Sequence, residues 1–238
     1  MPDTESPTTH RSFHEKIDTL KQRLLQMSQR AEELLALSVQ AFLSRDAGKA
    51  AAVLAADREV DALEVEIEAL AISLLALQQP MARDLRFIVS AIKITGDLER
   101  VSDHAVNIAQ SAQRMGDMRA MLQPPPEIKD MASRASAMLS DALDAMVRMD
   151  GALGRAVCKR DDEVDRLHES VFRIMLTHMA EAPKSISTAL EMLLVSRNLE
   201  RVADLATNIA EDAVYLAEGK NIKHHFEDRA AGSAPASA

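Results

Sequence analysis

The sequence has little of what holds small secreted proteins or β-rich proteins together. Its 238 residues include one cysteine, no tryptophan, one tyrosine, seven glycines and eight prolines. A single cysteine excludes an intramolecular disulfide and a cysteine-based zinc site. Because glycine and proline are scarce while alanine, leucine and methionine are plentiful, the composition argues against a turn-rich β protein and favours long helices.

Long apolar runs and an excess of basic residues are also missing. No stretch approaches the roughly eighteen uninterrupted apolar residues that would indicate a membrane span. The N-terminal segment MPDTESPTTH has neither the basic nor the apolar region of a signal peptide. The formal net charge of −9 is a poor basis for nucleic-acid binding, which depends on basic patches. We therefore expect a cytoplasmic protein that binds no nucleic acid.

Apolar residues recur at three- and four-residue steps along most of the chain, which is the pattern of amphipathic helices. Gly116 and the three prolines at 124–126 make the clearest interruption, because proline is excluded from a helix interior. The pattern predicts six long helices over residues 13–44, 49–77, 82–114, 127–149, 153–180 and 185–218. The predicted fold is all-α, with two tandem pseudo-symmetric three-helix bundles over 12–117 and 127–220, a proline-rich linker over 118–126, and flexible tails over 1–11 and 221–238.

The two halves of the chain repeat each other. Residues 27–61 align without a gap with residues 131–165, and 12 of the 35 positions are identical. The segment LERVSDHAVNIA (98–109) matches LERVADLATNIA (199–210) at 9 of 12 positions. A repeat of about one hundred residues is too long for a solenoid unit and indicates duplication of a domain.

The repeat preserves two acidic signatures. Residues four apart share one helix face, so each signature forms a stripe of oxygen ligands. On the second predicted helix of each half, Glu64 in one copy and His168 in the other extend the stripe by three residues. The signatures are Asp57 and Asp61 with Glu99, Asp103 and Asn107 in the first half, and Asp161 and Asp165 with Glu200, Asp204 and Asn208 in the second.

A bound cation is one explanation of these stripes. Like charges at this spacing destabilise a helix by about 0.2–0.5 kcal/mol per pair, and Glu99 continues a face that begins with the apolar residues Ile88 and Ile92. Carboxylate and amide oxygens are hard ligands that suit Mg²⁺, Mn²⁺ or iron, with Zn²⁺ as a further option. The alternative is a solvated acidic face, on which Asp57 and Asp61 cap a helix or pair with arginine.

Several arginines are candidates for contact with a partner. Arg100 and Arg201 follow the glutamate in each copy of the repeat, where an ion pair with an acidic neighbour competes with contact to an anion or a partner. The segment MARDLRFI, with Arg83, Asp84 and Arg86, has no counterpart in the second half, which reads PKSISTAL there. A partner surface that only the first bundle carries is one hypothesis for this asymmetry.

Together these motifs make the sequence similar to the PhoU family of bacterial phosphate-uptake regulators. The resemblance rests on MARDLRFIVSAIKITGDLERVSDHAVNIA, on its weaker copy ALEMLLVSRNLERVADLATNIAEDA and on the repeated Asp-x-x-x-Asp helices, and it covers about residues 12–220. It implies two tandem three-helix bundles, no enzymatic activity and a tendency to form homodimers. It also implies metal clusters held by Asp57, Asp61, Glu99 and Asp103 and by Asp161, Asp165, Glu200 and Asp204, with Asn107 and Asn208 as plausible additions.

The resemblance further implies a negative regulator of the phosphate-starvation response and of phosphate uptake. Such a protein couples the phosphate-importing ABC transporter to a membrane sensor histidine kinase, and reaches the membrane only through these partners. Two alternatives stay open from the residues alone. A dimetal carboxylate enzyme on a helical bundle would need Glu-x-x-His pairs, to which only Asp165 and His168 come near. A metal-free helical scaffold would use its acidic stripes as contact surfaces.

Overall fold

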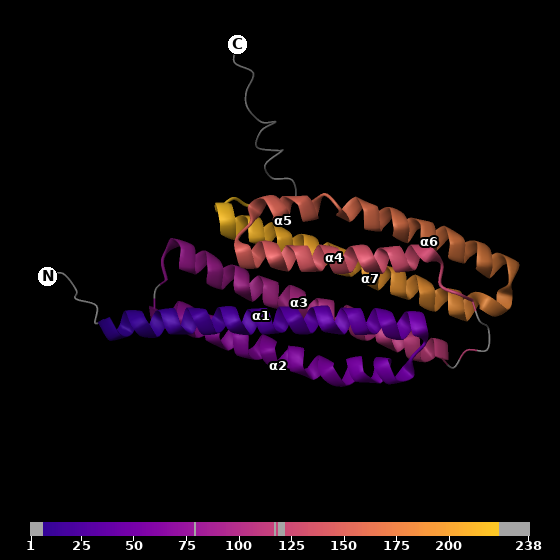
Figure 1. Cartoon of the computed structure of the whole chain (residues 1–238), viewed down its shortest axis with the longest axis horizontal. Helices are drawn as coiled ribbons and strands as arrows, with labels where there is room; N and C mark the ends of the chain where they lie inside the picture. Colours follow the sequence, from indigo (N-terminus) through magenta and orange to yellow (C-terminus); the bar gives the residue numbers. More distant parts are fainter. Residues whose placement is uncertain (1–6, 79, 117, 119–121, 224–238) are drawn as a thin grey trace, which may run out of the picture.

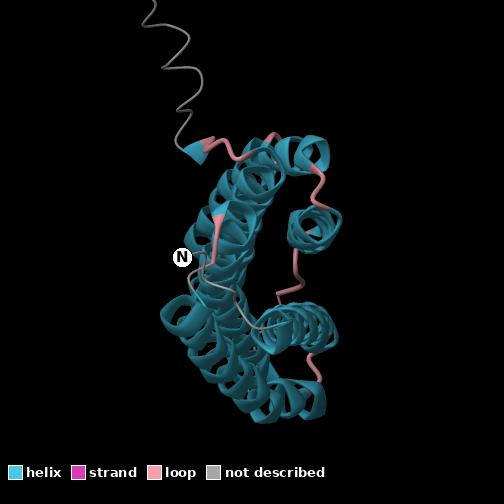
Figure 2. Ribbon diagram, turned by 90° about the vertical axis from the view of Figure 1, so that its left-hand side faces the viewer, coloured by secondary structure: helices cyan, strands magenta, loops and turns pink. Residues whose placement is uncertain are grey.

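All regular structure is helical in the residues that the computed structural model describes, which are 7–78, 80–116, 118 and 122–223. The first half forms the lower layer of Figure 1 and the second half the upper layer, and Figure 2 shows the same helices seen nearly along their axes. This arrangement confirms the predicted all-α fold of two three-helix units, with one long helix divided. The elements are α1 (Pro7–Ser44), α2 (Ala47–Gln78), α3 (Ala82–Gly116), α4 (Pro126–Arg148), α5 (Gly151–Cys158), α6 (Asp161–Glu181), the 3₁₀ turn η1 (Pro183–Ser185) and α7 (Ile186–Glu218).

The turn after the first helix is built in the same way in both halves. Arg45 follows α1 with φ 53°, and Met149 follows α4 with φ 51°, so a left-handed residue ends each helix. The next residue is an aspartate that caps the following helix. Asp46 accepts hydrogen bonds from two amides of α2, and Asp150 accepts one from α5. The duplication is therefore visible in backbone geometry as well as in sequence.

The second helix of the second half departs from the prediction. A continuous helix was expected over 153–180, but α5 ends at Cys158 and α6 begins at Asp161. Gly154 stands where the first half has Ala50, and glycine in a helix interior is about 1 kcal/mol less favourable than alanine. The interruption makes Asp161 the first residue of α6, where the partial positive charge of the helix N-terminus favours an acidic side chain.

Both predicted tails are shorter than expected within the described residues. The first helix begins at Pro7 rather than near Phe13, since proline is well suited to a first helical turn. After α7, Lys223 pairs with Asp212 at 3.3 Å, so residues 221–223 are held against the second half. Residues 1–6 and 224–238 lie outside the described part. Pro126 is the first residue of α4, so the predicted linker ends one residue earlier.

The two halves are joined mainly by antiparallel packing of α3 against α7. Each of these helices buries more of its circumference than a surface helix does, because it packs against its own half and against the other. The antiparallel direction follows from the side-chain pairs that link Lys93 to Asp212 and Arg114 to Glu191.

Two buried carboxylates on α7 fix the register of this contact. Arg114 of α3 holds Glu191 with two hydrogen bonds of 2.8 and 2.9 Å. Asp212 lies 3.6 Å from Lys93 and 3.3 Å from Lys223, with its side chain 2 % exposed. A shifted register would leave these buried carboxylates without their cations, which is unfavourable, so the observed register is preferred. Among the described helices, none combines the length and apolarity needed to cross a bilayer.

Two helical glycines offer a matched test of the packing around α5. A Cβ on Gly154 would lie 2.8 Å from the carbonyl oxygen of Ala210 and 2.9 Å from Val214, whereas a Cβ on Gly96 would meet nothing within 4 Å. We expect Gly154→Ala to lower the free energy of unfolding by about 1–3 kcal/mol, because α5 must move away from α7. We expect Gly96→Ala to raise it by about 0.5–1 kcal/mol. Urea unfolding of both variants measures this, and equal effects would contradict the close approach.

Candidate functional site

The acidic stripe of α2 faces that of α3. Burial, and after it the negative charges of Asp103, Glu64, Asp61 and Asp57, together raise the pKa of Glu99 to about 7. Burial also raises the pKa values of Glu64 and Asp103, and each carboxyl is affected by acids of the opposite helix. The sequence predicted both stripes and the extension to Glu64, and the structure brings them together as the first acidic cluster (Asp57, Asp61, Glu64, Glu99 and Asp103).

The second acidic cluster (Asp161, Asp165, Glu200 and Asp204) forms in the same way between α6 and α7. Burial, and after it the negative charges of Asp204, Asp165, Asp162 and Glu200, together raise the pKa of Asp161 to about 6. The pKa of Asp165 is raised by burial and by Asp204, while His168 opposes the increase. His168 also bonds Ser196 Oγ through Nδ1 at 2.8 Å. Each half of the duplication thus carries one group of mutually repelling carboxyls.

The clusters differ in how their first aspartate is satisfied. In the first half, Ser102 Oγ donates a hydrogen bond of 2.6 Å to Asp57 Oδ1. In the second half, Ala203 replaces the serine, and Asp161 Oδ1 is buried with no hydrogen-bond partner among the described residues. A buried carboxylate oxygen without a partner is costly. The serine-to-alanine difference is readable in the sequence, but its consequence becomes clear only when Ser102 is seen against Asp57.

Both arginines of the repeat lie beside acidic neighbours. Arg201 donates to Asp204 at 2.7 Å and lies 3.6 Å from Glu200, so it partly offsets the charge of the second cluster. Arg100 lies 3.9 Å from Asp97, which is a long contact, and the Arg100 side chain is 61 % exposed. The ion-pair interpretation of Arg201 is therefore supported by a short contact, whereas Arg100 makes a much weaker one.

The two asparagines have unequal surroundings. Asn208 forms a hydrogen bond with Asp97 of α3, whose pKa is raised to about 6 mainly by burial and lowered in part by Lys223 and by this bond. Its amide is therefore engaged with the opposite half rather than with the second acidic cluster alone. Asn107 is exposed on α3.

A polar cavity of about 340 Å³ lies where α3 of the first half meets α6 and α7 of the second. Arg100 and Arg201 both line it, together with Asp161 and Asp204 of the second acidic cluster. Beside it, His104 Nδ1 of α3 lies 2.9 Å from Asn198 Oδ1 of α7. The remaining lining residues are Leu205, Thr207 and Asn208. We call this the inter-half cavity.

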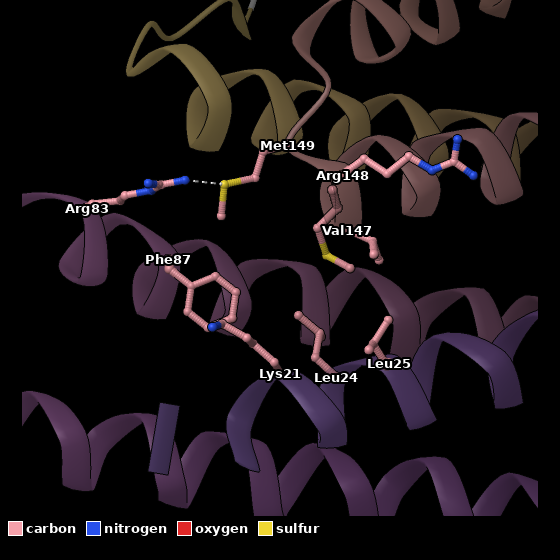
Figure 3. A pocket seen from close by; sticks show the side chains of 9 residues that line it. Lys21, Leu24, Leu25, Arg83, Phe87, Val147, Arg148 and Met149 are labelled. Atoms are coloured by element: carbon pink, nitrogen blue, oxygen red, sulfur yellow. Dashed lines mark hydrogen bonds between the residues drawn. The ribbon is translucent and has the colours of Figure 1, made fainter. Parts of the chain in front are cut away.

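An apolar groove with basic edges lies elsewhere on the surface, between α1, α3 and α4. It encloses about 370 Å³, and Leu24, Leu25, Phe87 and Val147 form much of its lining. Figure 3 shows Arg83 reaching across it, where Nη2 donates to Met149 Sδ at 3.1 Å. The other lining residues are Lys21, Met146 and Arg148, and Lys21 Nζ lies 5.9 Å from the centre of the Phe87 ring. We call this the basic-edged groove.

The predicted partner segment is divided by the structure. Arg83 lines the basic-edged groove, whereas Asp84 and Arg86 do not. Asp84 lies in the first turn of α3. Arg86 lies against Gly219, the left-handed residue that ends α7, and its Nε is buried without a hydrogen-bond partner among the described atoms. Sequence reasoning missed the α1 and α4 residues of the groove, because nothing local in the sequence brings them to Arg83.

Comparison with known proteins assigns both halves of the chain. The family model described as the PhoU domain matches residues 24–112 and again residues 128–213. This chain belongs to the PhoU family. The two matched segments lie within the two helical halves, so the internal repeat is a pair of PhoU domains.

Relatives and solved structures of the PhoU family match almost the whole chain. A Zymomonas mobilis protein named phosphate-specific transport system accessory protein PhoU homolog is 36% identical, over 90% of each chain. A Caulobacter vibrioides protein of the same name is 39% identical, over 90% of this chain and 93% of the relative. The crystal structure of PhoU from Pseudomonas aeruginosa superposes with a TM-score of 0.85 at 33% identity, covering 87% of this chain and 100% of that one.

The acidic clusters of the two PhoU domains have the donor chemistry that hard metal ions require. All their members are carboxylates, and Asp161 Oδ1 is available without breaking another bond. Within the described ranges, however, no group of three or more His, Cys, Asp or Glu side chains converges closely enough to hold an ion. A metal would therefore have to draw the facing stripes together.

The raised pKa of Glu99 predicts how the metal-free protein responds to pH. The unfolded chain releases this proton near the ordinary value of 4.5, whereas the folded protein keeps it up to about 7. The contribution of Glu99 to stability is therefore complete at low pH and is lost as pH rises through about 7. With chelator present, we expect the melting temperature of Glu99→Gln relative to wild type to increase as pH rises across this window. Glu66→Gln, on an exposed face of α2, is the control, and parallel pH profiles for wild type and Glu99→Gln would contradict the burial.

Proposed function

We propose that this PhoU-family chain is a negative regulator of the phosphate-starvation response and of phosphate uptake. In this role it would link the phosphate-importing ABC transporter to a sensor histidine kinase at the cytoplasmic side of the membrane. The observation that carries the proposal is the match, over nine-tenths of the chain, to accessory proteins of phosphate-specific transport systems. The family consists of regulatory and accessory proteins, and the chain is not an enzyme.

The proposal includes a metal-binding face in each PhoU domain, taken to extend over 12–117 and 127–220. The first acidic cluster would bind through Asp57, Asp61, Glu99 and Asp103, and the second through Asp161, Asp165, Glu200 and Asp204. Asn107 and Asn208 would contribute amide oxygens. A bound Mg²⁺, Mn²⁺, iron or Zn²⁺ ion would supply positive charge between two helices and fix their relative position. Support comes from the partial burial of Glu99 and Asp161 and from the repulsion by neighbouring carboxyls that raises their pKa values.

The basic-edged groove supports the regulatory part of the proposal as a surface for a protein partner. It combines exposed apolar side chains, Leu25 and Val147 being 39% and 52% exposed, with the cations Lys21, Arg83 and Arg148. A cationic edge is notable on a chain whose formal charge is −9. Complementary charge favours a partner segment that is amphipathic and acidic, as in other helix-in-groove complexes. We assign this surface to the kinase and leave other faces for the transporter and for a homodimer.

Metal content separates the metal-binding proposal from a metal-free scaffold. We expect protein purified without chelator to contain stoichiometric metal, with the first domain's share lost in Glu99→Ala/Asp103→Ala and the second domain's share lost in Glu200→Ala/Asp204→Ala. The matched control is Glu59→Ala/Glu66→Ala, which removes two exposed acids of α2. Elemental analysis measures all four proteins. Absence of metal from wild type, with equal stability of the variants, would leave a helical adaptor with acidic contact surfaces.

A groove variant tests the kinase link. Placing a carboxylate inside the apolar groove in Leu25→Asp, or reversing its edge in Arg83→Glu, should repel an acidic partner. We expect binding to the cytoplasmic part of the kinase to weaken about tenfold or more, and a phosphate-starvation reporter to become active in phosphate-rich cells. Leu190→Asp, at a 49% exposed position of α7 outside the groove, is the control. Repression by the groove variants at the level of wild type would contradict this assignment.

A further inference from the structure

Two residues that line the inter-half cavity have polar atoms without a hydrogen-bond partner among the described residues. Thr207 and Asp161 both line it, and one oxygen of each side chain, Thr207 Oγ1 and Asp161 Oδ1, is buried without a hydrogen-bond partner among the described residues. One is a hydroxyl that can donate, and the other is a carboxylate oxygen that can only accept when ionised. An unpaired hydroxyl and an unpaired carboxylate at one cavity favour a ligand with two parts. One part would accept a hydrogen bond from the hydroxyl, and the other would be a cation that the carboxylate binds.

The other polar residues of the cavity also include both hydrogen-bond donors and negatively charged acceptors. Arg100 has an exposed guanidinium and only the long 3.9 Å contact with Asp97, so it is available to an anion. Arg201, its counterpart in the repeat, lies at the same cavity while paired with Asp204. The second ring nitrogen of His104 remains after Nδ1 has contacted Asn198. Against these donors stand the carboxyls of Asp161 and Asp204, which would repel an anion that arrived alone.

We propose that the inter-half cavity binds a small oxyanion of the phosphate class together with a divalent cation. The carboxylates of Asp161 and Asp204 would hold the cation, and Arg100, Arg201 and Thr207 would hold the oxyanion. The cation removes the repulsion that the carboxylates would otherwise exert, and guanidinium groups are well matched to phosphate oxygens. The cation part rests on the metal binding proposed above for the second acidic cluster, whereas the oxyanion part does not follow from it.

The position of the cavity gives such a ligand a structural consequence. Arg100 and His104 belong to α3 of the first PhoU domain, and the other lining residues belong to the second. The first acidic cluster contributes nothing to this lining, so the two domains would respond differently to one ligand. An oxyanion bound by arginines of both domains would strengthen their contact.

Calorimetric titration of the full chain tests the proposal, with inorganic phosphate as the probe in the presence and absence of Mg²⁺. We expect measurable phosphate binding only with Mg²⁺. In Arg100→Gln, phosphate affinity should fall about tenfold or more, because a charge-assisted hydrogen bond is lost. In Thr207→Val, phosphate affinity should also fall while the melting temperature does not, since the hydroxyl has no partner to lose. Arg173→Gln, at an exposed arginine of α6, is the matched control.

Further titrations separate the oxyanion site from the metal binding proposed for the second acidic cluster. Mg²⁺ titrated without phosphate tests the second acidic cluster, and Arg100→Gln should leave that binding unchanged. Glycerol phosphate in place of phosphate distinguishes a phosphorylated metabolite from the free ion, and binding of either one supports the site. Mg²⁺ binding without any effect of phosphate or its ester would overturn the oxyanion site alone. Phosphate binding that is equal in wild type and Arg100→Gln would also overturn it.

Discussion

The antiparallel contact between α3 and α7 is the constraint on which the rest of the structure depends. Its register is fixed by two carboxylates of α7, Glu191 and Asp212, which are almost fully buried and paired with cations of α3. Their desolvation is tolerable only while those pairs are made, so sliding or tilting the helices carries a large penalty. Because α3 and α7 are the equivalent helices of a duplicated domain, one contact sets the geometry of both halves at once. Each acidic cluster is completed by its own half, whereas the inter-half cavity exists only through this contact.

The acidic clusters destabilise the metal-free fold through repulsion between their carboxylates. Carboxyls that could have faced water are partly buried opposite one another, and the raised pKa values of Glu99 and Asp161 reflect the free energy needed to ionise them there. The apolar core can hold the helices together despite this cost, because each half buries a continuous set of large side chains such as Leu20, Leu98 and Met175. A cation would turn the same repulsion into attraction, so metal occupancy and helix spacing are physically coupled in each PhoU domain.

The sequence was informative wherever a property depended on helical periodicity or on the repeat. Spacing of four residues placed Asp57 with Asp61 and Glu99 with Asp103 on common faces, and the repeat predicted both clusters before any packing was known. Properties that depend on contact between distant helices could not be predicted. The single exchange of Ala50 for Gly154 gave little sign that α5 would separate from α6. Arg83 and Arg86 are three residues apart, yet one lines the basic-edged groove and the other lies at the end of α7, because α4 and α7 approach this helix at different points.

Differences between the two copies of the repeat carry the clearest functional information. In the twelve-residue segment that begins at Leu98 and Leu199, three pairs of residues differ: Ser102 and Ala203, His104 and Leu205, and Val106 and Thr207. Each pair has at least one member at a polar site, since Ser102 satisfies Asp57 while His104, Leu205 and Thr207 line the inter-half cavity. The nine identical positions maintain packing and the shared acidic stripes, so the fold stays pseudo-symmetric. The changes therefore give one domain a satisfied aspartate, whereas in the other Asp161 Oδ1 and Thr207 Oγ1 are buried without a hydrogen-bond partner among the described residues. A regulator built from two equal domains would respond equally at both, whereas this divergence would allow one domain to bind a ligand that the other does not, as proposed for the inter-half cavity.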